Sequence, residues 1–164
     1  MTYKRFEEVP VWRDAAQLAR EVFDLVEDDS FRMRGDLASQ LARAGLSVSN
    51  NIAEGFGRGT KQELITFLYI AQGSADEVRS MLAVMSGMRR FSNLQSLISH
   101  LTSTCESISR QLTAWALNLQ DSDIKGRRYL DTELRDTRQK EQSRRQFIEK
   151  LKQLHPPPCA NPNP

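Results

Sequence analysis

The chain has 164 residues with two cysteines and two histidines, which suits one ordinary domain and excludes a disulfide framework or a cysteine-based metal cluster. Formal charges nearly balance at 23 Lys and Arg against 21 Asp and Glu, but residues 1–120 carry 13 against 14 and residues 121–164 carry 10 against 7. This balanced body and basic C-terminal part permit contact with nucleic acid without requiring it.

The sequence contains no apolar run of the length that a membrane-spanning helix needs, about 18 residues, and its start lacks the pattern of a signal peptide. We therefore expect a cytoplasmic protein without membrane contact. Cys105 falls in an apolar helical stripe and Cys159 in a proline-rich end, so both thiols are expected to be free, as suits a reducing compartment.

Residues 1–10 are predicted to form an extended lead-in, and Pro10 suits the first turn of a helix because its missing N–H has no partner there. The first helix is indicated by apolar residues at the alternating four-three spacing of an amphipathic helix. These residues are Val11, Ala15, Leu18, Val22 and Leu25. Polar residues from Asp28 to Ser30, followed by Gly35, mark the exit and the turn.

A second helix is predicted from a similar stripe, formed by Leu37, Leu41, Ala44, Val48 and Ile52. Small residues on one side of this helix, among them Gly45, would let a neighbouring helix approach closely. Gly55 is expected to end the helix in the left-handed conformation, so residues 56–59 are predicted to be a short loop.

The corner between the second and third helices carries several polar groups. Thr60 and Glu63 fit a capping box, in which the threonine hydroxyl accepts from the Glu63 N–H and the carboxylate reaches back. Asn50, Asn51 and Glu54 lie just before this corner. We expect them to make buried hydrogen bonds that fix the corner or a subunit contact, and full exposure would favour a binding role instead.

The third helix has the clearest pattern in the chain. Its first stripe alternates four and three at Leu64, Leu68, Ala71, Ala75, Val78, Leu82 and Met85. A second stripe predicts a second buried face and supplies the candidate interface with another copy of the chain, formed by Phe67, Ile70, Ser74, Met81, Val84 and Met88. The alternative is the central helix of a monomer. Gly73 is interpreted as a close helix crossing rather than a ligand contact.

Ser92 and Asn93 are predicted to begin a fourth helix. Its stripe consists of Leu94, Ile98, Leu101, Cys105, Ile108, Leu112, Trp115 and Leu119. The opposite face is rich in Ser, Thr and Gln and is expected to be solvated. Four amphipathic helices with short connections and no strand pattern predict an all-α fold, an antiparallel up-and-down four-helix bundle over residues 11–120.

The chain changes character after this predicted bundle. Residues 121–154 are predicted to be a basic C-terminal helical extension, because the pairs Asp131/Arg135, Asp136/Lys140 and Glu141/Arg145 favour an exposed helix. Partial disorder in isolation is the alternative. Residues 155–164 are predicted to be a disordered Pro-rich tail.

No residue pattern indicates catalysis. His100 and His155 have no Cys, Asp or Glu at metal-ligand spacing. The glycines of residues 55–59 lack the preceding strand and the Gly-Lys-Ser/Thr ending of phosphate-binding loops. We therefore expect no enzyme, no cofactor and no metal.

Basic residues are the remaining candidates for chemistry, because several of them together could contact a phosphate backbone. The simpler interpretation is a solvated face, or, for Arg89 and Arg90, compensation of a helix dipole. The candidate nucleic-acid-binding residues are Arg58, Lys61, Arg89, Arg90, Lys125, Arg127, Arg128, Arg135, Arg138, Lys140, Arg144 and Arg145.

Two runs resemble a known family. FEEVPVWRDAAQLAREVFDL and SVSNNIAEGFGRGTKQELITFLYIAQGSADEVRSML are similar to the four-helix-bundle family of 23S rRNA intervening sequence proteins, which includes the accessory variability proteins (Avd) of diversity-generating retroelements. The resemblance spans about Phe6 to Leu119, so residues beyond Asp121 have no counterpart.

The resemblance implies a homopentameric ring with a positively charged surface and no catalytic residues. For the retroelement members it implies binding to a reverse transcriptase and its template RNA in mutagenic cDNA synthesis. Two hypotheses follow for this chain. The first is a non-enzymatic oligomeric accessory protein that binds RNA or an RNA/DNA hybrid, with a reverse transcriptase as a further partner. The second is a scaffold that binds only protein.

Overall fold

The computed structural model describes residues 3–122, 137 and 139–148 of the chain. All regular secondary structure in these residues is helical, in agreement with the predicted all-α class. The chain divides into two compact units, Met1–Ile124 and Lys125–Pro164. We call the described part of the first, residues 3–122, the helical unit.

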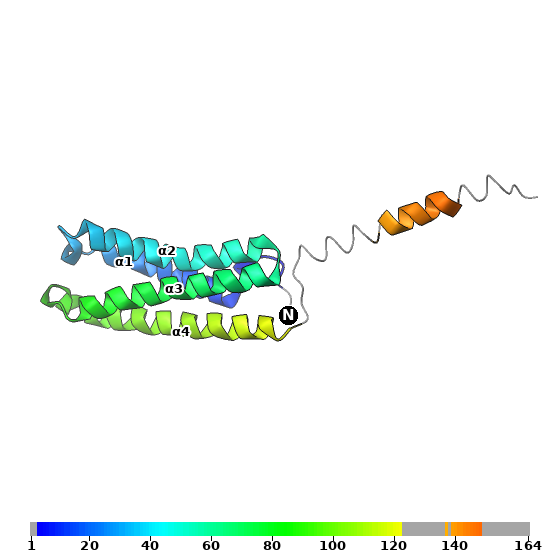
Figure 1. Cartoon of the computed structure of the whole chain (residues 1–164). Coiled ribbons are helices and arrows are strands. Elements are labelled where there is room, and N and C mark those ends of the chain that lie inside the picture. Colours follow the sequence, from blue (N-terminus) through cyan, green and yellow to red (C-terminus); the bar gives the residue numbers. More distant parts are fainter. Residues whose placement is uncertain (1–2, 123–136, 138, 149–164) are drawn as a thin grey trace, which may run out of the picture. The chain divides into compact units, whose positions relative to one another are not determined.

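The helical unit contains four long helices, α1 Pro10–Val26, α2 Gly35–Arg58, α3 Lys61–Ser86 and α4 Gln95–Gln120. Short 3-10 helices precede and connect them, η1 Phe6–Glu8, η2 Asp29–Phe31 and η3 Arg89–Leu94. α1 and α3 each pack against both α2 and α4, and the long helices lie side by side (Figure 1).

The core follows the predicted stripes. In α1 every stripe residue from Val11 to Leu25 is buried. The stripes of α3 and α4 are buried along their middle parts, and at their ends Leu64, Trp115 and Leu119 pack partly against the core. Each fully buried leucine or isoleucine contributes about 1.5–3 kcal/mol, so these stripes decide which faces of the helices meet.

The lead-in before α1 is less extended than predicted. A 3-10 turn forms at Phe6–Glu8, closed by the Val9 N–H donating to the Phe6 carbonyl at 3.0 Å. The ring of Phe6 packs edge-on against Trp12 with centroids 5.0 Å apart, and Val9 is buried. Burial of these apolar groups therefore fixes the turn, while Pro10 takes the first helical position as predicted.

The predicted end of the second helix is wrong by one turn. α2 continues through Gly55 to Arg58, and the left-handed residue is Gly59, with φ 84°. Gly55 is buried, and a Cβ placed on it would lie 2.6 Å from the Cβ of Phe67 on α3. The glycine is needed for the close approach of two helices rather than for a turn, and the loop predicted at residues 56–59 shrinks to the short link between Arg58 and Lys61.

The predicted capping box at the start of α3 is confirmed in its main hydrogen bond. The Thr60 hydroxyl accepts from the Glu63 N–H at 3.2 Å. The Glu63 carboxylate also returns to Thr60, where it accepts from the hydroxyl rather than from the backbone N–H. The box satisfies one of the open N–H groups of α3, so this helix begins where the sequence indicates.

Two other glycines in the long helices behave differently from each other. Gly45 lies against Val22 of α1, whose side-chain atoms would be 3.3 Å from an added Cβ, so the predicted close approach is confirmed there. Gly73 has no atom of the described chain within 4 Å of an added Cβ and is exposed. The predicted close helix crossing at Gly73 is therefore wrong within one copy of the chain.

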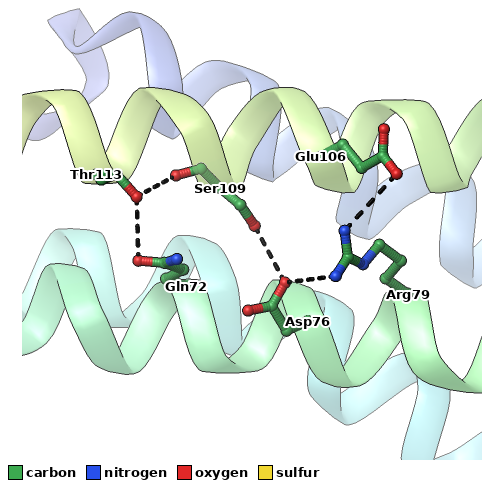
Figure 2. Close-up of polar contacts among 6 residues, drawn as sticks. All are labelled: Gln72, Asp76, Arg79, Glu106, Ser109 and Thr113. Atoms are coloured by element: carbon green, nitrogen blue, oxygen red, sulfur yellow. Dashed lines mark hydrogen bonds and ion pairs between the residues drawn. The ribbon is translucent and has the colours of Figure 1, made fainter.

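The polar face of α4 is only partly solvated, which corrects the prediction for that face. Figure 2 shows its side chains meeting those of α3 in a polar seam, which consists of Gln72, Asp76, Arg79, Glu106, Ser109 and Thr113. Thr113 donates to Gln72 at 3.3 Å and Ser109 to Asp76 at 3.4 Å, while Arg79 lies 3.6 Å from Glu106. Each contact is half-exposed and contributes little energy on its own, but together they fix the register of the two helices.

The start of α4 lies later than predicted. Ser92 and Asn93 fall within η3, and α4 begins at Gln95 without a side-chain cap. The Asn93 side chain instead accepts from the Ser30 hydroxyl at 3.3 Å. The Asn93 side chain, which the sequence suggested as a helix cap, is therefore used in a tertiary contact with the α1–α2 connection.

The second unit is described at residues 137 and 139–148, which are helical and exposed. This agrees with the predicted exposed helix over that range. The remaining parts of the predicted extension and the whole Pro-rich tail lie outside the described residues.

Candidate nucleic-acid and subunit interfaces

Two of the candidate basic residues, Arg58 and Lys61, are engaged within the helical unit. Arg58 forms an ion pair with Glu54 one turn earlier, and its guanidinium lies 5.2 Å from the centroid of the Phe67 ring. The hydrogen bond that Arg58 donates to Glu54, and the negative charge of Glu54, raise the pKa of Arg58. Lys61 donates from Nζ to the carbonyl of Ser122 at 2.9 Å, which ties the start of α3 to the end of α4.

Arg90 is also engaged, because its guanidinium donates to the carbonyl oxygens of Ser30 and Arg32. These hydrogen bonds join the α3–α4 connection to the α1–α2 connection. The rings of Phe31 and Phe91 pack beside them with centroids 5.0 Å apart, and both rings are buried. We call this end of the helical unit, formed by the α1–α2 and α3–α4 connections, the clamped pole.

Arg89 is the one candidate in the helical unit whose side chain is left free. It is exposed, and it makes no hydrogen bond or ion pair with a described residue. In the second unit, Lys140, Arg144 and Arg145 are likewise exposed on the described helix. The other candidates lie outside the described residues, namely Lys125, Arg127, Arg128, Arg135 and Arg138.

Sequence reasoning missed two basic residues at the clamped pole. Arg32 and Arg34 are exposed, flank Met33, and have no side-chain partner among the described residues. The run Arg-Met-Arg before Gly35 was a usable signal, because a loop that places two cations around an apolar residue differs from an ordinary polar turn.

The candidate subunit interface divides into inner and outer residues. Ser74 lies inside, where its hydroxyl shares a 2.9 Å hydrogen bond with that of Ser47 and donates to the Ile70 carbonyl. Met81 packs partly against the core, and Phe67 is half-buried. The remaining candidates are exposed, Ile70 and Val84 on α3 and Met88 just after its end. The wide second stripe therefore combines part of the protomer's own core with an outer apolar face.

The outer face of α3 carries few charges. Ile70 and Val84 share it with Tyr69, an exposed aromatic residue that the sequence pattern did not single out, and the exposed Met88 follows just after the helix. Asp76 and Arg79 point toward α4 in the polar seam (Figure 2). Between Glu63 and Arg89 this leaves Glu77 as the charged residue of α3 outside the seam. A long helix face with one charge and several exposed apolar residues is typical of an interaction surface.

The polar corner residues take three different positions. Asn51 is half-buried and donates to the carbonyl and the hydroxyl of Ser47 at 2.8 and 2.9 Å, so it braces α2 internally. Glu54 is exposed and holds Arg58. Asn50 is exposed, so the buried hydrogen bond expected for it does not form within the helical unit.

The titratable groups described outside the polar seam include a cross-helix pair and a buried thiol. His100 Nε2 lies 3.2 Å from a carboxylate oxygen of Glu21, a cross-helix contact that sequence spacing did not reveal. Among the described residues no three His, Cys, Asp or Glu side chains come together as metal ligands. Burial raises the pKa of Cys105 to about 12, so its thiol is a core group. No helix within the described ranges is long and apolar enough to cross a membrane.

Comparison with known proteins gives one family. A family model described as 23S rRNA-intervening sequence protein matches residues 7–114. No curated protein matches the chain. The matched segment begins at η1 and ends in the last turns of α4, so it covers the helical unit and excludes the basic C-terminal part.

Proposed function

The chain belongs to the 23S rRNA-intervening sequence protein family, and from this premise we propose that it is a non-enzymatic protein that binds RNA and associates with copies of itself. The scaffold in this proposal is an antiparallel up-and-down four-helix bundle, which the side-by-side packing of α1 to α4 supports. Five copies in a ring is the arrangement that the resemblance to the family suggests.

The observation that carries RNA binding is the set of exposed cations that internal contacts leave free. In the second unit, Lys140, Arg144 and Arg145 are exposed within one helical stretch of six residues. In the helical unit, Arg89 is exposed, whereas Arg58, Lys61 and Arg90 are held by partners. Affinity for a phosphate backbone increases with the number of cations that contact it, and repetition of this set in several copies multiplies those contacts.

Self-association is supported by the outer face of α3. Its exposed apolar residues Tyr69, Ile70 and Val84 lie along a helix that carries little charge on that side, and the exposed Met88 follows its end. A second copy with the same face is the simplest partner, because a closed symmetric assembly covers such a surface on every protomer. Changing Ile70 and Val84 to glutamate should lower the mass measured by light scattering to that of one chain, without loss of helical circular dichroism.

RNA binding is tested by fluorescence anisotropy with the full chain and a labelled RNA at several salt concentrations. Replacement of Lys140, Arg144 and Arg145 by glutamine should weaken binding and lower the salt slope by about 2, since each contact to single-stranded RNA contributes about 0.7. The matched control replaces Gln139, Ser143 and Gln146 of the same helix by alanine and should bind like the unchanged protein. Binding of the unchanged protein that is absent or independent of salt would contradict the proposal.

A protein-binding scaffold is the second candidate, and one observation favours it. Phe147 and Ile148 are exposed at the end of the described C-terminal helix, with Phe147 62% exposed. An amphipathic helix that presents adjacent apolar residues can dock into a groove of another protein. If replacement of these two residues by serine removes a protein partner, and the unchanged protein and the variant both fail to bind RNA, the scaffold is the better description.

The resemblance to the retroelement accessory proteins adds a specific partner to the first candidate. We propose a reverse transcriptase together with its template RNA as the complex that the assembled protein joins. Co-purification of the chain with such an enzyme, in the presence and absence of RNA, tests this partner. Retention that needs the RNA supports the proposal, and no retention under either condition refutes this partner while leaving RNA binding intact.

A further inference from the structure

The α1–α2 connection holds one residue in an unusual backbone conformation. Met33 has φ 67°, and it is the only non-glycine residue with positive φ among the described residues. Its side chain is 91% exposed. The left-handed region is unfavourable for residues with a Cβ, and an exposed methionine adds nothing to the core. The conformation belongs to a tight turn that the Arg34 N–H closes on the Phe31 carbonyl, and glycine or asparagine would fit this position without strain. The fold therefore explains the turn but not the choice of an exposed methionine at its tip.

Hydrogen bonds hold the backbone on both sides of Met33. On one side, the Ser30 N–H donates to the carboxylate of Asp28 at 2.8 Å, and Arg90 holds the carbonyls of Ser30 and Arg32. On the other side, the Arg34 N–H donates to the carbonyl of Phe31 at 2.8 Å. The clamped pole therefore holds the backbone on both sides of Met33, and the methionine side chain is presented at the surface.

Three exposed arginines belong to the same pole as the methionine. Arg32 and Arg34 flank it in sequence, and Arg89 lies in the connection that Arg90 fastens to the same segment. The side chains of all three arginines are exposed and have no partner among the described residues. Together Arg32, Met33, Arg34 and Arg89 form what we call the arginine–methionine tip.

The nearby carboxylates form no ion pair with Arg32, Arg34 or Arg89 among the described residues. Asp28 accepts from Ser30, and Asp36 lies in the first turn of α2, where a negative charge suits the helix N-terminus. Asp29, in η2, has no such role. The arginines of the tip are therefore unpaired, while Asp28, Asp29 and Asp36 keep their negative charge and oppose an anionic ligand.

We propose that the arginine–methionine tip is a contact site for single-stranded RNA, in which Met33 packs against an unstacked base and the three arginines bind the adjacent phosphates. This proposal rests on the proposed function and assigns RNA binding to a specific location. Unstacked bases expose apolar faces next to phosphates, and proteins recognise single-stranded RNA through both groups. Insertion of an apolar side chain beside arginines is also a known way to engage bases. A lipid surface fits less well, because one methionine offers far less apolar area than an interfacial helix.

Replacement of Met33 by glycine separates binding from folding. Glycine adopts positive φ without strain, so Met33→Gly should raise the melting temperature while it weakens RNA binding about fivefold, the equivalent of partial burial of one methionine side chain. Met33→Leu keeps an apolar side chain and should retain the affinity. The measurement is fluorescence anisotropy of the full chain with a labelled unstructured oligoribonucleotide, together with thermal denaturation of each variant.

Charge variants test the second half of the site. Exchange of Arg32, Arg34 and Arg89 for glutamine should lower the salt slope by about 2, and Asp29→Asn should strengthen binding. If the unchanged protein binds RNA and the Met33→Gly and triple-glutamine variants bind equally well, the tip is not the site, although the proposed function stands. If the unchanged protein binds no RNA at low salt, both fail. If the tip variants lose binding to anionic phosphatidylserine vesicles while their RNA binding equals that of the unchanged protein, the proposal is also overturned.

Discussion

Gly55 allows a quantitative test of how α2 and α3 meet. An alanine at this position would bring its Cβ to 2.6 Å from the Cβ of Phe67 and 3.3 Å from the Cδ1 of Leu64. Carbon atoms prefer separations of about 3.5–4.0 Å, so the two helices would have to separate by about 1 Å at this crossing. The Cβ of Phe67 is attached directly to the backbone of α3, and side-chain rotation cannot move it away.

The expected magnitude combines two opposing effects. Overpacking of a well-packed contact costs about 1–3 kcal/mol. Replacement of glycine by alanine inside a helix gains up to about 1 kcal/mol. The clash involves atoms next to both backbones, so we expect the cost to dominate and Gly55→Ala to destabilise the protein by about 1–2 kcal/mol.

Gly57 is the matched control in the same helix. It has nothing within 4 Å of an added Cβ, so Gly57→Ala keeps the helix-propensity gain and lacks the clash. Urea denaturation followed by circular dichroism at one protein concentration should place the midpoint of Gly55→Ala below, and that of Gly57→Ala at or above, the midpoint of the unchanged protein, with equal slopes. A rise in the midpoint for both variants would show that α2 and α3 do not approach closely at Gly55.

Three further predictions concern single side chains. Thr60→Ala removes the cap of α3 and should lower the free energy of unfolding by about 1 kcal/mol in urea denaturation, and an unchanged midpoint would contradict the capping box. Because burial raises the pKa of Cys105 to about 12, a Cys159→Ser variant should react with iodoacetamide at pH 8 only after denaturation, and rapid labelling of the native protein would refute this burial. Hydrogen bonds from Ser30, first from its side chain and then from its backbone, lower the pKa of Asp28. The ionised carboxylate therefore stabilises the folded state above the ordinary pKa of 3.8, and this stability is lost as the pH falls through the lowered pKa of the folded state. Melting temperatures between pH 7 and 2 should therefore fall less steeply for Asp28→Asn than for the unchanged protein, and parallel curves would refute this contribution.

The sequence predicted the buried faces well because helical periodicity is a local property of the chain. The stripe from Leu68 to Met85 is buried without exception. Capping followed the same logic at Thr60, whose partner lies three residues away. These features depend on neighbours along one helix, so a single sequence contains the information.

The errors occur where a residue's partner lies on another element. A glycine after an apolar helical stripe usually marks the end of the helix, but Gly55 lies opposite Phe67 and allows α2 and α3 to approach closely. Arg90 is one of two adjacent arginines, and only the fold shows that it binds the carbonyls of Ser30 and Arg32 while Arg89 stays free. Pair contacts between helices set these roles, and periodicity along one helix contains no information about them.

The candidate interface on α3 was predicted only in part, because some of its residues face the core and others face outward. The width of the second stripe predicted a second covered face, yet Ser74 turns inward to Ser47, and Val84 turns outward with 63% exposure. A stripe drawn at 100° per residue cannot place the border between the protomer's own core and the outer surface, because neighbouring helices decide how far around α3 the core extends.

The clamped pole has a consequence for proteolysis. Arg32 and Arg34 are exposed and would ordinarily be preferred sites for trypsin in a loop. A protease needs several residues in an extended conformation, and here Arg90 holds the Arg32 carbonyl while Phe31 is buried against Phe91. Cleavage after these arginines must wait until the two connections separate together, so the rate of nicking reports the opening of the whole pole rather than the exposure of one loop.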